Sequence, residues 1–151
     1  MLKSVEVAIN YQTSIVREAR RIIEDKKVKA VSQFRYCILT SQYFEQHFTP
    51  NYLSLQKLAS LMIEIYGVVS TWKPMAICVL DTVADLYNVV GVMPTTGKSN
   101  VSKQKNFFGN QFLIAAEQAK VRHTRDFFDS AMIQVQKEDF MNFLNKLIKL
   151  Q

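Results

Sequence analysis

The stretch with the strongest suggestion of chemistry is GVMPTTGKSN, which spans residues 91–100. A phosphate-binding loop requires G-x-x-x-x-G-K-[ST], in which four residues between the glycines let backbone N–H groups wrap a phosphate. Gly97, Lys98 and Ser99 match the end of this pattern, but five residues separate Gly91 from Gly97. The loop is therefore degenerate, and a nucleotide-binding enzyme using GVMPTTGKS is one alternative function.

The spacing of two carboxylates is also compatible with a metal or acid–base site. Asp81 and Asp85 stand four residues apart, which would place both on one face of a helix. A metal or acid–base site in a bundle normally adds His or further carboxylates from facing helices. Neither His47 nor His123 has a Glu three residues before it. We therefore expect a solvated or ion-paired stripe, with no metal, no cofactor and no catalytic residues.

The two cysteines, Cys37 and Cys78, lie in apolar patterns without CxxC spacing and without a nearby His. Reduced, buried thiols that act as small hydrophobic groups are the expected state. The sequence also lacks the G-x-S-x-G and H-E-x-x-H patterns of common hydrolases. These observations predict a protein that is not an enzyme and has no small-molecule substrate.

The formal net charge of +6 comes from two stretches of the chain. Residues 17–35 hold seven Lys or Arg against three acids, and residues 86–116 contain no acid. Lysines contact phosphates without reading sequence, so a nucleic-acid-binding coat or accessory protein is a second alternative function. The candidate polyanion-binding residues are Lys98, Lys103, Lys105, Arg17, Arg20, Arg21, Lys26, Lys27, Lys29 and Arg35.

The elements that must position these residues have the apolar spacing of helices. Helices are predicted over 3–25, 28–47, 50–69, 73–91, 106–121, 124–136 and 137–150, and whether the last three are separate or fused is left open. Thr49 and Pro50 are typical of an N-cap and a first helical residue, and Gly91 of a helix end. With only 4 Gly and 3 Pro to make turns, we expect few loops.

The fold expected from this pattern is a single all-α domain over residues 1–151, a bundle of five or six amphipathic helices. The helix near 74–91 is hydrophobic over most of its circumference, so it should be central. A polar basic loop follows at about 93–105.

The last predicted helix has one apolar face, which can close the core of the protein or dock into a partner's groove. This candidate partner-binding face consists of Phe140, Phe143, Leu144, Leu147 and Ile148. A hydrophobic content of 48% leaves much apolar surface for a small bundle. We therefore predict a non-enzymatic assembly subunit or adaptor that acts through protein–protein contacts, either self-associating or within a larger complex.

The location is predicted from what the sequence lacks. No apolar run reaches the ~18 residues that a membrane-spanning helix needs, so no transmembrane segment is expected. The N-terminal MLKSVEVAIN lacks the apolar run and cleavage site of a secretory signal. We therefore expect an intracellular, cytoplasmic protein.

Overall fold

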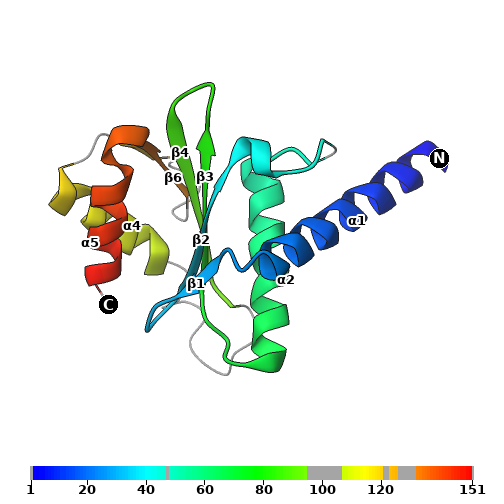
Figure 1. The fold of residues 1–151 in the computed structure, drawn as a ribbon, viewed down its shortest axis with the longest axis horizontal. Helices are drawn as coiled ribbons and strands as arrows, with labels where there is room; N and C mark the ends of the chain where they lie inside the picture. The colour runs from blue at the N-terminus through cyan, green and yellow to red at the C-terminus, as the bar shows by residue number, and fades with distance from the viewer. Residues whose placement is uncertain (1, 47, 95–106, 121–122, 126–131, 151) are drawn as a thin grey trace.

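The computed structural model describes residues 2–46, 48–94, 107–120, 123–125 and 132–150. Over these residues the chain forms a six-stranded sheet in the order β1-β2-β3-β4-β6-β5, flanked by helices (Figure 1). β2 and β3 run parallel, and the other neighbouring strands run antiparallel. The fold is therefore α/β, and the predicted all-α bundle is wrong.

Pairs of consecutive strands alternate with helices along the chain. In order they are α1 (Leu2–Glu24), β1 (Val28–Ala30), β2 (Arg35–Thr40), the 3-10 turn η1 (Ser41–Tyr43), α2 (Tyr52–Val69), β3 (Met75–Asp81), β4 (Leu86–Val92), α4 (Phe107–Ala119), β5 (His123–Arg125), β6 (Met132–Gln136), the 3-10 turn η2 (Lys137–Asp139) and α5 (Phe140–Lys149).

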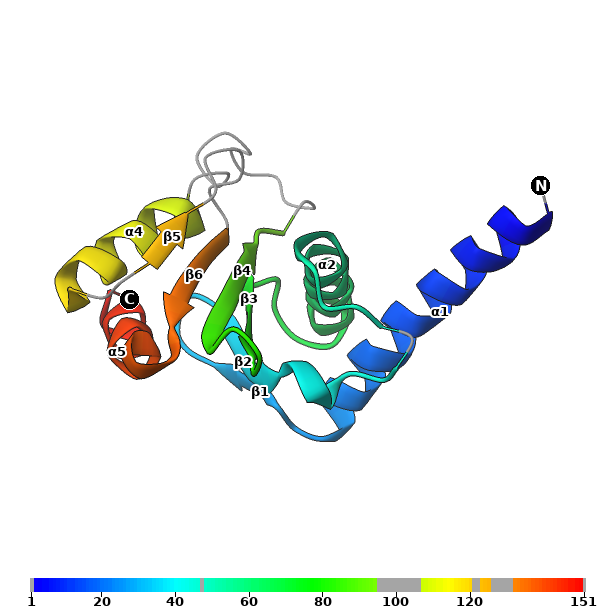
Figure 2. The ribbon, with the colours of Figure 1, turned by 90° about the horizontal axis from the view of Figure 1, so that it is seen from above.

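These elements form three layers, which Figure 2 shows from above. α1 and α2 cover one face of the sheet, and their buried side chains form one apolar core with β2, β3 and β4. α4 and α5 cover the other face and form a second core with β3, β4 and β6. The N-terminal half of α1 extends beyond the other elements (Figures 1 and 2).

The predicted central helix near 74–91 is in fact the hairpin of β3 and β4. Met75, Ile77 and Val79 face the first core, whereas Ala76 and Cys78 face the second. A strand covered on both faces is apolar at every position, so it lacks the alternation that identifies a half-exposed strand. The inference that this segment is central was correct, and its assignment as a helix was wrong.

Asp81 and Asp85 shape the turn of this hairpin instead of sharing a helical face. The Asp81 carboxylate accepts hydrogen bonds from the backbone N–H groups of Val83 and Ala84, at 3.0 and 3.1 Å. The Asp85 N–H donates to the Asp81 carbonyl at 2.9 Å, and Asp85 adopts a left-handed φ of 54°. Asp tolerates this conformation and hydrogen-bonds its own turn, which explains the residue type at both positions.

Two further predicted helices are strands or turns. The segment 28–47 contains β1, β2 and η1, and β2 alternates between buried Cys37 and Leu39 and half-buried Tyr36 and Ile38. The segment 124–136 contains β6, which pairs with β4 and so joins the sheet. In both cases β-branched and aromatic residues at apolar positions suit a pleated sheet as well as a helix face.

The helices predicted over 3–25, 50–69, 106–121 and 137–150 are confirmed as α1, α2, α4 and α5. The cap of α2, however, is Asn51 and not Thr49 with Pro50. The Asn51 side chain accepts from the Ser54 N–H at 2.9 Å, and the Ser54 hydroxyl accepts from the Asn51 N–H at 3.1 Å. This reciprocal pair is a capping box that satisfies two otherwise free donors.

Gly91 lies inside β4, opposite Ala76 of β3, so its assignment as a helix end is wrong. A Cβ atom at this position would lie 2.5 Å from Cγ of the Phe108 ring. Glycine is therefore needed because α4 brings an aromatic ring directly onto the strand. The local structure around Gly91 is that of a packed sheet and not of a phosphate loop.

Candidate functional site

Apolar side chains remain exposed around the last turns of α2. Val68 and Val69 are 82% and 76% exposed, and Ile65 and Trp72 lie exposed beside them in the chain. We call these four residues the α2-end surface. Ile65, Val68 and Val69 fall on one side of the helix because positions three and four residues apart are neighbours.

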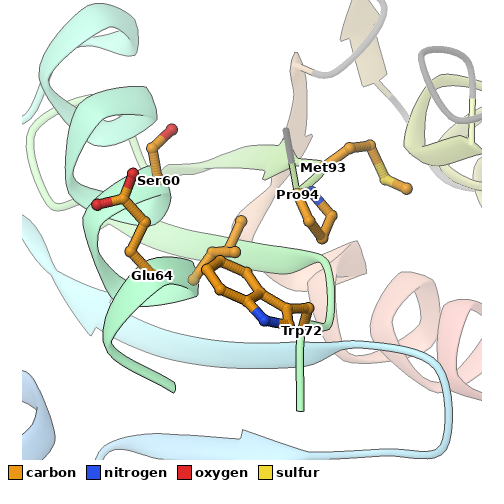
Figure 3. Close-up of a pocket in the computed structure, with 6 residues that line it drawn as sticks. Ser60, Glu64, Trp72, Met93 and Pro94 are labelled. Atoms are coloured by element: carbon orange, nitrogen blue, oxygen red, sulfur yellow. The ribbon is translucent and has the colours of Figure 1, made fainter. Parts of the chain in front are cut away.

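Trp72 is held in place by the backbone of α2. A Cβ atom at Gly67 would lie 2.4 Å from the indole ring, so the ring packs flat against the helix only because residue 67 is glycine. Figure 3 shows Trp72 beside Glu64 and Ser60 of α2, with Met93 and Pro94 across a small hollow. This hollow has a volume of about 20 Å³, close to that of one water molecule.

The exposed apolar groups of the α2-end surface are of the kind that suits a protein contact. An aromatic ring that is fixed in place and 44% exposed loses little conformational freedom when a partner covers it. Trp is also the residue type most enriched among the energetically dominant positions of interfaces. The hollow itself is too small for a metabolite, so the exposed apolar groups are the features of this surface that a partner could contact.

The predicted polyanion-binding arginines are mostly engaged within the fold. Arg17 pairs with Glu45 at 3.2 Å, and Arg20 pairs with Glu24 at 3.0 Å, both in exposed positions. Arg35 is buried, donates to the Thr71 carbonyl at 2.8 Å and lies over a tyrosine ring. Arg17, Arg20 and Arg35 therefore each have a partner within the fold, and the side chains of Arg17 and Arg20 remain exposed to solvent.

Arg21 holds the turn after β2 against α1. It pairs at 3.0 Å with Glu18, whose side chain is fully buried, and donates to the Tyr43 carbonyl at 3.0 Å. Glu18 also accepts from the backbone N–H of Glu45 at 2.9 Å. A buried carboxylate requires such partners, so this network fixes the loop that follows η1.

The lysines of the first basic stretch do converge. Lys26, Lys27 and Lys29 line a hollow of about 310 Å³, and the remaining lining residues are Asp25, Tyr36 and Ile38. We call these six residues the lysine hollow. Among the described residues no carboxylate lies within ion-pair distance of the three lysines. The Asp25 carboxylate accepts a hydrogen bond from the Tyr43 hydroxyl.

Tyr43 can supply this hydrogen bond over the whole physiological range of pH. Burial of the phenol, and then its hydrogen bond to Asp25, raise the pKa of Tyr43 above its ordinary value. The Lys27 ammonium lies 5.9 Å from the centre of the same ring. The one acid of the lysine hollow is therefore tied to a neighbouring side chain.

The remaining predicted residues divide into two groups. Lys98, Lys103 and Lys105 of the predicted basic loop lie outside the described residues, as does His47. Four of the five residues of the candidate partner-binding face, Phe140, Phe143, Leu144 and Leu147, are buried in the second core, and Ile148 packs against it. Because α5 uses this face inside the chain, the face is not open to a partner.

Aromatic contacts show how closely that face is packed. The rings of Tyr87 and Phe140 stack with centroids 3.7 Å apart and planes 14° apart. Phe143 meets Phe112 of α4 with centroids 6.0 Å apart. Stacked and edge-on pairs of this kind add stability beyond the burial of area, so α5 is an integral part of the fold.

The prediction of buried, reduced cysteines is confirmed. Cys37 and Cys78 are both free thiols and fully buried, one in each core. Burial raises the pKa of Cys37 to about 12, and burial followed by the charge of Cys37 raises the pKa of Cys78. Neither thiol is a nucleophile at neutral pH, because the reactive species is the thiolate.

The α2-end surface was missed by reasoning from the sequence. The predicted helix over 50–69 is apolar over most of its surface, which gave no way to separate buried Met62 from exposed Val68. The sequence feature that could have indicated this surface is the pair Val68-Val69, which is followed directly by polar Ser70 and Thr71. Two consecutive apolar residues at the end of a helix favour an exposed apolar patch there.

Comparison with known families identifies the chain. The model of the CDC45 family matches residues 1–150, so the chain belongs to the CDC45 family. The cell division control protein 45 homolog of Dictyostelium discoideum is 27% identical over 141 residues, which cover 93% of this chain and 21% of that protein. Cell division control protein 45 of Saccharomyces cerevisiae is 28% identical over 154 residues, which cover 96% and 23%.

A solved structure shows the same fold. The crystal structure of CDC45 from Entamoeba histolytica matches with a TM-score of 0.67 and 19% identity, covering 93% of this chain and 28% of that one. The chain thus spans about a fifth of the length of the two curated relatives. Among the described residues no helix is long and apolar enough to cross a bilayer.

The family corrects the function predicted from the sequence. A CDC45-family α/β domain replaces the expected helical-bundle assembly subunit. The two alternatives, a nucleic-acid coat or accessory protein and a nucleotide-binding enzyme, fit the family no better.

Proposed function

We propose that this member of the CDC45 family is a domain of a DNA replication initiation factor and works within protein complexes of the replication machinery. The match to the family over residues 1–150 is the observation that carries this proposal. The chain spans about a fifth of the length of its curated relatives, so the initiation activity is proposed for the whole protein of this family. This chain contributes a rigid α/β platform.

The α2-end surface is the proposed point of contact with a replication protein. Val68 and Val69 at the end of α2, together with Trp72 just after it, supply an apolar patch, and α2 is held against the sheet by the first core. Burying these side chains would remove apolar area from water, and they would form the centre of a larger interface, because a specific complex buries roughly 800 Å² per partner.

In this proposal the domain acts by binding and not by catalysis. Among the described residues whose spacing resembled chemistry, Asp81 closes a turn and Gly91 accommodates Phe108, whereas Gly97, Lys98 and Ser99 lie outside the described residues. Protection of the folded protein by ATP and Mg²⁺ against thermal unfolding would contradict this view.

Replication takes place in the nucleus, so the proposed location is nuclear instead of the cytoplasmic one expected from the sequence. The family, and not any signal in this chain, supports this location. A fluorescently tagged full-length protein that stays in the cytoplasm throughout the cell cycle would count against it.

The test is replacement of the full-length protein in its own cells by a variant carrying Val68→Asp and Val69→Asp. We expect binding to purified replication proteins to weaken roughly 30-fold or more, because two charges would be buried at the contact. DNA synthesis at the start of S phase, measured by incorporation of a labelled nucleoside, should fall in parallel.

Leu53→Asp is the matched control, because Leu53 is also exposed on α2 but lies in its first turn. This variant should bind and support synthesis as the unmodified protein does. Normal binding and synthesis by the Val68 and Val69 variant would remove the α2-end surface from the proposal. Normal S-phase entry without the full-length protein would overturn the replication role itself.

A further inference from the structure

β1 is an outer strand of the sheet with one unpaired edge. The Val31 N–H donates to the Phe34 carbonyl at 2.9 Å, which closes the hairpin between β1 and β2. Hydrogen-bonded positions alternate along an antiparallel pair, so Lys29, opposite Tyr36, also bonds inward. The backbone N–H and C=O groups of Val28 and Ala30 therefore point away from β2 toward the free edge.

The lysine hollow adjoins this edge. Lys29, Tyr36 and Ile38 come from β1 and β2, whereas Lys26 and Lys27 come from the turn between α1 and β1. Tyr36 and Ile38 are half-buried and pack at the border of the second core, so they form a partly apolar floor. Three lysines line the hollow together with this floor, and its one acid, Asp25, already accepts a hydrogen bond from Tyr43.

A ligand that binds here must match both the free backbone edge of β1 and the positive charge of the lysine hollow. An unpaired strand edge binds the main chain of an extended peptide, which adds to the sheet as a further strand. Alternate side chains of such a strand point to the same face, so every second residue would lie over the lysine hollow. The excess of positive charge selects carboxylates at those positions.

We infer that β1 and the lysine hollow together bind an extended, acidic segment of another polypeptide, whose main chain pairs with Val28 and Ala30. Carboxylates of the segment lie among Lys26, Lys27 and Lys29, and its aliphatic stems lie on Tyr36 and Ile38. This site is separate from the α2-end surface, and it does not depend on the replication role proposed above.

The binding test uses a fluorescein-labelled peptide of ten alternating Glu and Val residues and the full chain, with fluorescence anisotropy as the readout. We expect saturable binding that weakens as salt rises, because exposed ion pairs are screened. The triple variant Lys26→Glu, Lys27→Glu and Lys29→Glu should weaken binding at least roughly tenfold.

The matched control makes the same change of charge elsewhere, with Lys120→Glu, Lys137→Glu and Lys149→Glu at exposed positions. It should lose no more than the small, long-range part of the affinity. Equal losses in the two triple variants would overturn the site, because only net charge would then matter. Tighter lysine-dependent binding of a single-stranded oligonucleotide than of the peptide would also overturn it.

The strand pairing has its own test in Ala30→Pro. This change removes an N–H that points outward while the hydrogen bonds to β2 are retained, so circular dichroism should be unchanged and peptide affinity should fall several-fold. Ala30→Ser retains the N–H and should bind normally. Unchanged affinity in Ala30→Pro would overturn the pairing, and the Val68 and Val69 variant should bind the peptide normally whatever the outcome for replication.

Discussion

Two glycines make room for aromatic rings in this domain. Gly67 lets Trp72 lie on α2, and Gly91 lets Phe108 of α4 lie on β4. In the sequence, Gly91 was interpreted as a helix end or as part of a degenerate phosphate loop, because glycine serves both purposes. Its actual role depends on a residue seventeen positions later, which no local pattern reveals.

Gly91→Ala is therefore expected to destabilise the domain. The new methyl group would meet the Phe108 ring at 2.5 Å, and over-packing a core typically costs about 1–3 kcal/mol. Urea denaturation measures the loss in free energy of unfolding. In a Phe108→Ala background the same change should cost much less, because the ring is gone. Equal costs in the two backgrounds would contradict the assigned role of Gly91.

At the scale of elements, sequence periodicity located the helices but not the central strands. The four confirmed helices are amphipathic or begin at clear breaks, whereas β3 is buried on both faces and so has no polar alternation. The sheet also pairs β4 with β6 across more than forty residues of sequence, and such contacts leave no local trace.

The start of α2 shows how local chemistry sets an element boundary. Asn51→Ala should lower the free energy of unfolding by about 1 kcal/mol, because the Ser54 N–H loses its acceptor and the capping box is broken. Thr49→Ala, at the cap position expected from the sequence, should change stability little because Thr49 is exposed. Thermal unfolding of the two variants checks this order, and a larger loss for Thr49→Ala would refute it.

At the scale of the whole molecule, the sequence indicated which residue types form the candidate surfaces, basic and apolar, better than it indicated where in the fold these surfaces lie. The basic stretch over residues 17–35 does contain a cluster, which is formed by Lys26, Lys27 and Lys29 at the lysine hollow. Three of its arginines form ion pairs, and Arg35 is buried and donates to the Thr71 carbonyl. Among the described residues, four of the exposed large apolar side chains lie together at the end of α2, whereas the expected face on α5 fills the core. Whether a residue is exposed, ion-paired or buried depends on the side chains that the fold brings next to it, and these are distant in the sequence.

The buried thiols link global stability to pH. Folding raises the pKa of Cys37 from 9.0 to about 12, so between these values the unfolded chain releases a proton that the folded chain retains. The contribution of this thiol to the free energy of unfolding is therefore fully present below pH 9.0. It is lost as pH rises toward 12, at about 1.4 kcal/mol per pH unit. Cys37→Ala should lower stability at pH 8 through the lost packing, yet show a shallower decline between pH 9 and 10.5 in urea titrations. Burial, the largest cause of the raised pKa values of Cys78, Tyr66 and Tyr87, persists in both proteins. Cys78 and Tyr66 lose only the smaller contribution from the Cys37 charge, so most of the difference in slope belongs to Cys37. Parallel slopes would mean that Cys37 is exposed to solvent in the folded protein.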